Sequence, residues 1–207
     1  MSYENHTHEQ YEPIGVLAIC VHPFFLTPLR SDKVYQEFLE KISKFYPTKR
    51  NNITVITPME KIPGVTIPNN NNERFSWEDL QAELIENAEK DRCLHYAFPN
   101  TLIIKDLIAP GSDINNFKRI LNEMKLIITP ETQIILGGEY TQVCVLGVAF
   151  LLFNEFIQIN EIKIRSDACV PYKSRFTGEN MPMDLPEKCG IEYSEDGEYI
   201  LLRRKTT

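Results

Sequence analysis

The sequence predicts an α/β fold in which a mostly parallel central sheet is covered by helices on both faces. Short apolar or β-branched runs alternate along the chain with stretches of helical spacing, as parallel strands joined by crossover helices require. The run at residues 14–21 is apolar without alternation, which is typical of a central strand buried on both faces. An Asp196-Gly197 pair between two short apolar segments predicts a β-hairpin at the C-terminal end.

The strands of this sheet are expected where β-branched and apolar residues cluster between turn residues. Pro23 ends the first strand, because proline cannot donate to a sheet ladder. The third strand ends in Lys105, and the fourth ends at Gly137-Gly138. The five expected strands cover residues 14–21, 52–57, 101–105, 133–136 and 161–166, and residues 167–171 terminate the last.

Helices are expected where apolar side chains recur every three or four residues. Ser31-Asp32 provides an N-cap for the first, and Ser76 opens the second with a capping-box pattern. The expected helices cover residues 31–47, 76–90, 114–125 and 143–153. Residues 58–74, with the tract Asn69–Asn72, are expected to form a surface loop, because they are rich in turn residues.

The composition and charge of the chain indicate which partners and which cellular compartment to expect. The chain of 207 residues fits one domain, expected at 14–207, after a polar and disordered lead-in at residues 1–13. A net charge of -7 argues against a nucleic acid or an anionic membrane as partner, and no apolar run is long enough to cross a bilayer. The odd, scattered cysteines favour a reducing compartment, the cytoplasm. No metal-binding pattern is present.

The strongest chemical feature is Cys144, which follows the strand and the two glycines. It lies near the start of a helix too apolar for the protein surface, with Leu146, Phe150 and Phe153 on its buried side. Unpaired backbone N–H groups and the helix dipole favour a thiolate at such a position. A cysteine on an apolar helix is also a common core residue, so the pattern alone leaves both interpretations open.

The segment Gly137–Val145, G-G-E-Y-T-Q-V-C-V, resembles the nucleophile motif of the isochorismatase-like cysteine hydrolases, approximately G-V-x-T-x-x-C-V. The resemblance extends over residues 14–170, with an apolar first strand, a strand ending in lysine and a strand ending in Ser166-Asp167-Ala168. It implies a three-layer, Rossmann-like sandwich and hydrolysis of a small amide, carbamoyl or related substrate through a cysteine thioester.

The resemblance also implies roles for individual residues. Cys144 would be the nucleophile, Lys105 the supporting lysine, and the backbone N–H groups of Tyr140 and Cys144 the oxyanion hole. No cofactor or metal is implied, because the D-x-H motif of the metal-binding members is absent. The partners expected are a small-molecule substrate and further copies of the chain in a homo-oligomer.

One position departs from the family pattern. Cys20 stands where the family has an aspartate that acts as general base, and loss of a general acid–base costs ~10²–10⁴ in rate. His22 is the candidate substitute base, provided that the first strand continues far enough to put it on the face of Cys20. Asp167 is interpreted as a loop cap.

Three hypotheses follow from this departure. The chain is a cysteine hydrolase with weak or redirected chemistry, or a catalytically inactive relative that serves as a binding or regulatory module. The third hypothesis is a redox pair of Cys20 and Cys144, which requires Cα atoms within about 7 Å.

Overall fold

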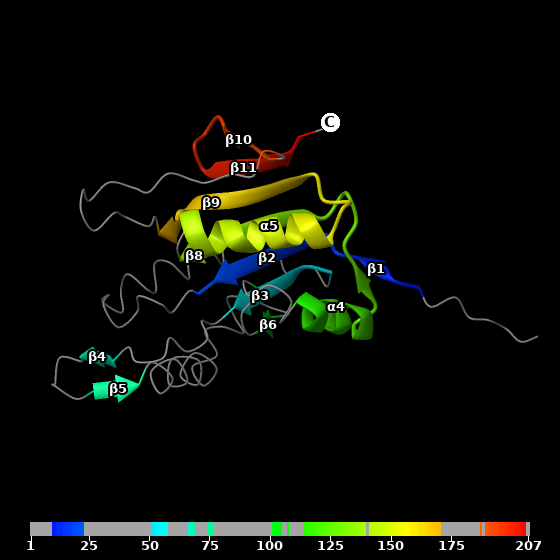
Figure 1. The fold of residues 1–207 in the computed structure, drawn as a ribbon. Helices are drawn as coiled ribbons and strands as arrows, with labels where there is room; N and C mark the ends of the chain where they lie inside the picture. Colours follow the sequence, from blue (N-terminus) through cyan, green and yellow to red (C-terminus); the bar gives the residue numbers. More distant parts are fainter. Residues whose placement is uncertain are drawn as a thin grey trace, which may run out of the picture.

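The computed structural model describes residues 10–22, 51–57, 66–68, 74–76, 101–104, 107, 114–139, 141–170, 187 and 189–205 (Figure 1). Two α-helices, one π-helical turn and eleven strands lie in these ranges. In chain order they are β1 (Glu12–Pro13), β2 (Val16–Val21), β3 (Ile53–Thr57), β4 (Thr66–Pro68), β5 (Arg74–Ser76), β6 (Thr101–Ile103), α4 (Ile114–Glu123), β7 (Leu126–Ile127), β8 (Gln133–Glu139), η2 (Thr141–Val145), α5 (Leu146–Glu155), β9 (Glu161–Val170), β10 (Cys189–Tyr193) and β11 (Tyr199–Arg204).

Seven strands form one mixed sheet in the order β10-β11-β9-β8-β2-β3-β6. The pairings from β6 through β3, β2 and β8 to β9 are parallel, and β11 and β10 join antiparallel at one edge. The α/β character and the largely parallel sheet are thus confirmed. Strand order reverses between β2 and β8, because β3 pairs with one side of β2 and β8 with the other. In open α/β sheets such a switch point is where ligands bind, beyond the carboxyl ends of the strands.

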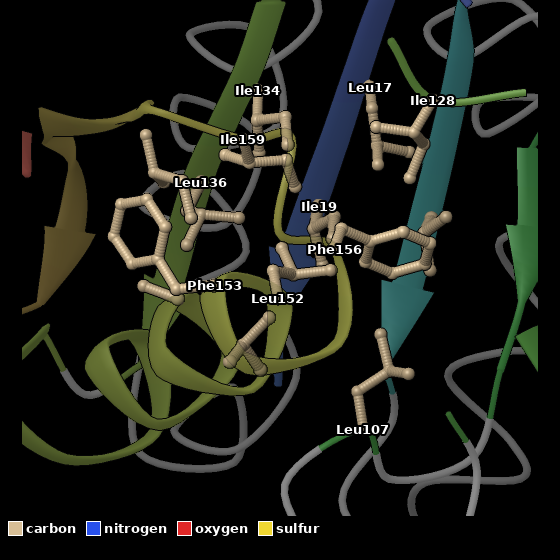
Figure 2. Close-up of a cluster of buried hydrophobic side chains, with 14 of the residues drawn as sticks. Leu17, Ile19, Leu107, Ile128, Ile134, Leu136, Leu152, Phe153, Phe156 and Ile159 are labelled. Carbon is tan, nitrogen blue, oxygen red and sulfur yellow. The ribbon is translucent and has the colours of Figure 1, made fainter. Parts of the chain in front are cut away.

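The hydrophobic core lies between one face of this sheet and α5. Leu152, Phe153 and Phe156 point toward the strand residues Ile19 and Leu136 (Figure 2). Because side chains alternate along a strand, Leu17, Ile19 and Val21 face this core from β2. The helix is apolar almost all round, since five of its ten residues are buried and two more pack against the core.

Polar side chains fix the amino ends of the central strands. Asn52 accepts a hydrogen bond from the Val16 N–H at 3.0 Å, and the Thr132 hydroxyl donates to the Ile14 carbonyl at 2.8 Å. Both side chains are buried, so each bond satisfies a group that has lost contact with water. These bonds set the register of β2 against its neighbours β3 and β8.

The C-terminal hairpin turns at the predicted residues. Gly197 adopts φ 71°, and the Asp196 carboxylate accepts hydrogen bonds from the Glu198 N–H at 2.9 Å and the Ser194 hydroxyl at 2.6 Å. Arg204, at the end of β11, donates through Nη2 to the Phe153 carbonyl near the end of α5. The hairpin is therefore attached both to β9 and to the last turn of the core helix.

Several expectations need correction. The strand expected to end at Gly137-Gly138 runs through both glycines and ends at Glu139. The loop expected at residues 58–74 contains β4, which pairs antiparallel with β5. The expected lead-in at residues 1–13 includes β1, which pairs in parallel with β7, a pair too short for a periodicity signal. The strand expected to end at Ser166 continues to Val170, because Cys169 and Val170 pair with Gly138 and Glu139 of β8. Asp167 is consequently not a loop cap but a strand residue, 2.5 Å from the Arg165 guanidinium.

The helices expected at residues 31–47 and 76–90 lie outside the described residues, apart from residue 76. Ser76, expected to cap the second of them, belongs to β5. Within the described ranges, no helix has the length and apolar character needed to cross a membrane.

Candidate functional site

The candidate site is built on a close approach of two central strands. Gly138 near the end of β8 pairs with Val21 at the end of β2 and adopts φ 127°. A Cβ atom at this position would lie 1.9 Å from the Val21 carbonyl oxygen, a distance at which no side chain fits. Only glycine combines this φ with this contact, so the second glycine of the motif has a definite structural cause.

Cys144 lies in the π-helical turn that follows this close approach. The η2 residues Thr141–Val145 lead directly into α5, so the helical segment begins five residues earlier than α5 itself. Cys144 is half-buried and packs against the core, while its neighbour Val143 is 53% exposed. The Cys144 N–H is among the first four of the helical segment, where the dipole favours negative charge. Single π-helical turns are frequent at functional sites.

Cys169 of β9 lies beside this turn, a position that the sequence did not single out. It pairs in register with Gly138 of β8. Burial raises the pKa of the Cys169 thiol to about 12, although the Gly138 backbone and the Thr141 side chain act in the opposite direction. Cys169 is therefore a neutral thiol at physiological pH.

Cys20 is buried in β2, in register with Gly137 of β8. Leu17, Ile19 and Val21 belong to the core cluster, and Cys20 is not among its residues, as strand alternation requires. Cys144 packs against that same cluster. The sheet thus lies between Cys20 and the cluster on which Cys144 packs.

His22 follows β2 and is bound to β3. The strand ends at Val21, and His22 turns away with φ 47°, so the alternation that would align it with Cys20 stops one residue earlier. The His22 N–H and Nδ1 both lie 2.9 Å from the Thr57 carbonyl oxygen. A carbonyl only accepts, so Nδ1 carries the proton, and a neutral ring has its lone pair on Nε2. This buried, left-handed conformation is strained for a histidine.

Thr57 has the second unusual polar group at this edge. Its side chain is fully buried, and its hydroxyl has no hydrogen-bond partner, the one such side chain in the described part of the chain. Thr57 pairs with Val21, which pairs with Gly138, which pairs with Cys169. These four residues form a row across the carboxyl ends of β3, β2, β8 and β9.

Two predicted site residues, Lys105 and Tyr140, lie outside the described residues. The strand before Lys105 is β6, which is three strand positions from β8, because β3 and β2 lie between them. At the usual strand spacing this is about 14 Å along the sheet.

Cavities are found at the other end of the sheet. One of about 250 Å³ lies between α4, β7 and the residues after α5, and one of about 280 Å³ lies at the amino ends of β8 and β9. In Figure 1 the arrowheads of β2 and β9, which mark the carboxyl ends of these strands, point away from α4 and β1. Neither cavity includes a predicted site residue. No group of three or more potential metal-binding side chains occurs among residues that the structure describes.

The sequence therefore located Cys144 on its strand–turn–helix and Cys20 and His22 at the end of the first strand. It missed Thr57, Thr141 and Cys169, for which the only available signal was their position at the end or beyond the end of an expected strand. Comparisons of the chain with protein-family models, with curated proteins and with solved structures find no match.

Proposed function

We propose that the protein is a cysteine-dependent hydrolase of the isochorismatase-like type, which acts on a small amide, carbamoyl or related substrate. A three-layer arrangement with helices on both faces of the sheet, and assembly into a homo-oligomer, belong to the same proposal. The observation that supports it best is the placement of Cys144: the glycine-dependent close approach of β8 to β2 lies at the switch point, and β8 is followed by the helical turn that carries the thiol.

In the proposed reaction, the Cys144 thiolate attacks the substrate carbonyl carbon, and a C–S bond forms as the carbonyl oxygen takes up negative charge. Backbone N–H groups at the start of the helical segment would stabilise this oxyanion. Collapse breaks the bond to the leaving amine, which needs a proton, and water then cleaves the thioester. Lys105 is assigned to support the thiolate by its positive charge.

The proton-transfer group is the weak point of this assignment. Cys20 occupies the position of the family's aspartate. Its thiol, however, is buried on the opposite face of the sheet from the core cluster against which Cys144 packs. His22 remains the candidate base, with a lone pair on Nε2 in its neutral form. Activity is therefore expected to be weak relative to an enzyme with a carboxylate, by ~10²–10⁴.

The test is to incubate the protein with a panel of small amides, carbamoyl compounds and esters, and to look for an acyl group on Cys144 by mass spectrometry. Cys144→Ser should abolish both the adduct and the turnover, whereas Cys189→Ser is the matched control, because that buried thiol lies at the far edge of the sheet. Absence of an adduct and of Cys144-dependent turnover across the panel would contradict the proposal. It would favour the alternative, a catalytically inactive relative that serves as a binding or regulatory module.

A further inference from the structure

Exposed apolar side chains gather around the cavity of about 250 Å³ between α4 and β7. In the described part of the chain, four of the six large hydrophobic side chains that are exposed to solvent belong to this surface, which we call the α4–β7 face. Two of them line the cavity and two lie within two residues of a lining residue; the four are Tyr11, Ile127, Met124 and Ile157. A group of exposed apolar side chains with a polar rim marks an interaction surface.

The cavity in this face has an apolar floor. The floor consists of four buried side chains, Leu121, Leu126, Ile128 and Phe156. The polar side chains of the wall are already hydrogen-bonded within the chain: the Tyr11 hydroxyl donates to Asn122 Oδ1, and Gln158 Nε2 donates to the Ile128 carbonyl at 3.0 Å. An apolar side chain therefore fits this cavity better than a polar ligand does, because it buries further apolar surface and breaks no hydrogen bond.

Ile157 is the matching protrusion on the same face. Its side chain is 81% exposed, and its chain neighbours Phe156 and Gln158 both line the cavity. The turn that presents it is closed by a hydrogen bond from the Ile159 N–H to the Phe156 carbonyl at 3.0 Å. A protrusion and a cavity side by side make a surface self-complementary, because two copies related by a two-fold axis can each insert the protrusion into the other's cavity.

The charges beside the α4–β7 face also suit a second copy of the chain. Lys118 forms an ion pair with Glu155 at 2.5 Å, and Arg119 forms one with Glu123 along α4. The whole chain carries a net charge of -7, so two copies repel each other when they meet through their acidic surface. Two faces whose charges are paired meet without this repulsion, whereas they offer no net charge to attract an anionic or a cationic partner.

We infer that the α4–β7 face is a dimerisation surface, in which Ile157 of each copy fills the apolar cavity of the other. The inference names the surface of the homo-oligomer and so rests on that part of the proposed function, whereas the chemistry of Cys144 does not enter it. The cavity lies at the opposite end of the sheet from the carboxyl ends of the strands. Dimerisation through this face therefore leaves the edge that carries Cys144 open to substrate in both copies (Figure 1).

Sedimentation equilibrium of the full chain over a range of concentrations tests the surface. The wild-type protein should approach twice the 24.0 kDa mass of the chain. Ile157→Asp should weaken the dimer by about 10²-fold or more, because each apolar cavity loses its side chain and meets a carboxylate instead. Tyr193→Asp is the matched control: this ring is 65% exposed on β10, the edge strand, and its loss should leave dimerisation unchanged. At concentrations where wild type is monomeric, Ile157→Asp should unfold in urea as wild type does, because the side chain is mostly exposed in its own chain.

A mixed sample of wild-type protein locates the protrusion directly. Copies with ¹³C-labelled leucine are combined with unlabelled copies, and nuclear Overhauser effects are expected from the Ile157 methyl groups of one copy to the Leu121 and Leu126 methyl groups of the other. A chain that keeps the monomer mass up to about 1 mM, the weak end of specific association, would overturn the inference. A dimer that Ile157→Asp does not weaken, or one without these intermolecular effects, would overturn it as well.

These outcomes are separable from the failure of the hydrolase. A dimer of this geometry whose Cys144 is never acylated removes the hydrolase and keeps the surface. A monomeric chain with an acylated Cys144 removes the surface and keeps the hydrolase.

Discussion

Gly138→Ala perturbs the close approach of β8 to β2, on which the candidate site is built. The new Cβ would lie 1.9 Å from the Val21 carbonyl oxygen and 2.7 Å from the Val21 N and C atoms. These are backbone atoms, so no rotamer change relieves the contact, and β8 has to move away from β2. Alanine at φ 127° also costs about 1–3 kcal/mol in backbone strain.

The loss of strand pairing between β2 and β8 adds to the destabilisation. Separation of the two strand ends removes the bonding around Val21 and Gly138, at about 1 kcal/mol for each backbone hydrogen bond. We therefore expect Gly138→Ala to reduce the free energy of unfolding by about 3–5 kcal/mol. Gly197→Ala is the matched control: its φ of 71° is also positive, but no atom lies within 4 Å of the added methyl group. Its expected cost is about 1–2 kcal/mol.

The assay is urea unfolding followed by far-ultraviolet circular dichroism, with midpoint and slope compared for both variants and wild type. A Gly138→Ala protein that does not accumulate in folded form agrees with a cost near the total stability of a domain of this size. A Gly138→Ala protein as stable as Gly197→Ala would refute the assignment of this glycine to a forced close approach.

Three further predictions concern the core, the hairpin and alkaline stability. Phe117→Ala should cost about 3–5 kcal/mol, because this ring is fully buried, whereas Ile157→Ala, at a residue 81% exposed, should be nearly neutral in the same urea assay. Arg204→Ala should cost about 1–2 kcal/mol, because its guanidinium donates to the Phe153 carbonyl and lies 5.1 Å from the centre of that ring; Arg204→Lys should recover only part of the loss in thermal unfolding. The raised pKa of Cys169 means that the unfolded chain releases this proton first, so stability should fall between pH 9.0 and about 12, and the fall should be shallower in Cys169→Ser.

The fold was predictable where strands and helices have strong patterns. The run at residues 14–21, the spacing of Phe117 and Leu121, and the Asp196-Gly197 turn each specify their element through local physical chemistry. The short pair β1–β7 has no such pattern, because two residues carry no periodicity. The extension of β9 to Val170 depends on its pairing with the end of β8, a partner that no local pattern reveals.

The site was predictable only in part, for a related reason. Cys144 could be recognised because the glycines and the apolar helix surround it in the sequence. The position of Cys169 beside Gly138 depends on an irregular register between two strands. The orientation of His22 toward β3 depends in the same way on a long-range bond, to Thr57. Side-chain contacts between distant segments have no signature in a single sequence.

The central claim is that Cys144 is a nucleophile activated by its position in the helical turn. The direct measurement is the rate of alkylation by iodoacetamide across pH, resolved for each cysteine by peptide mass spectrometry, with the buried Cys189 as the reference in the same sample. We predict that Cys144 reacts first and that its rate has a midpoint well below about 8.5, the ordinary value for a thiol. A midpoint at or above that value, or a Cys144 no more reactive than the buried Cys189, would contradict the account.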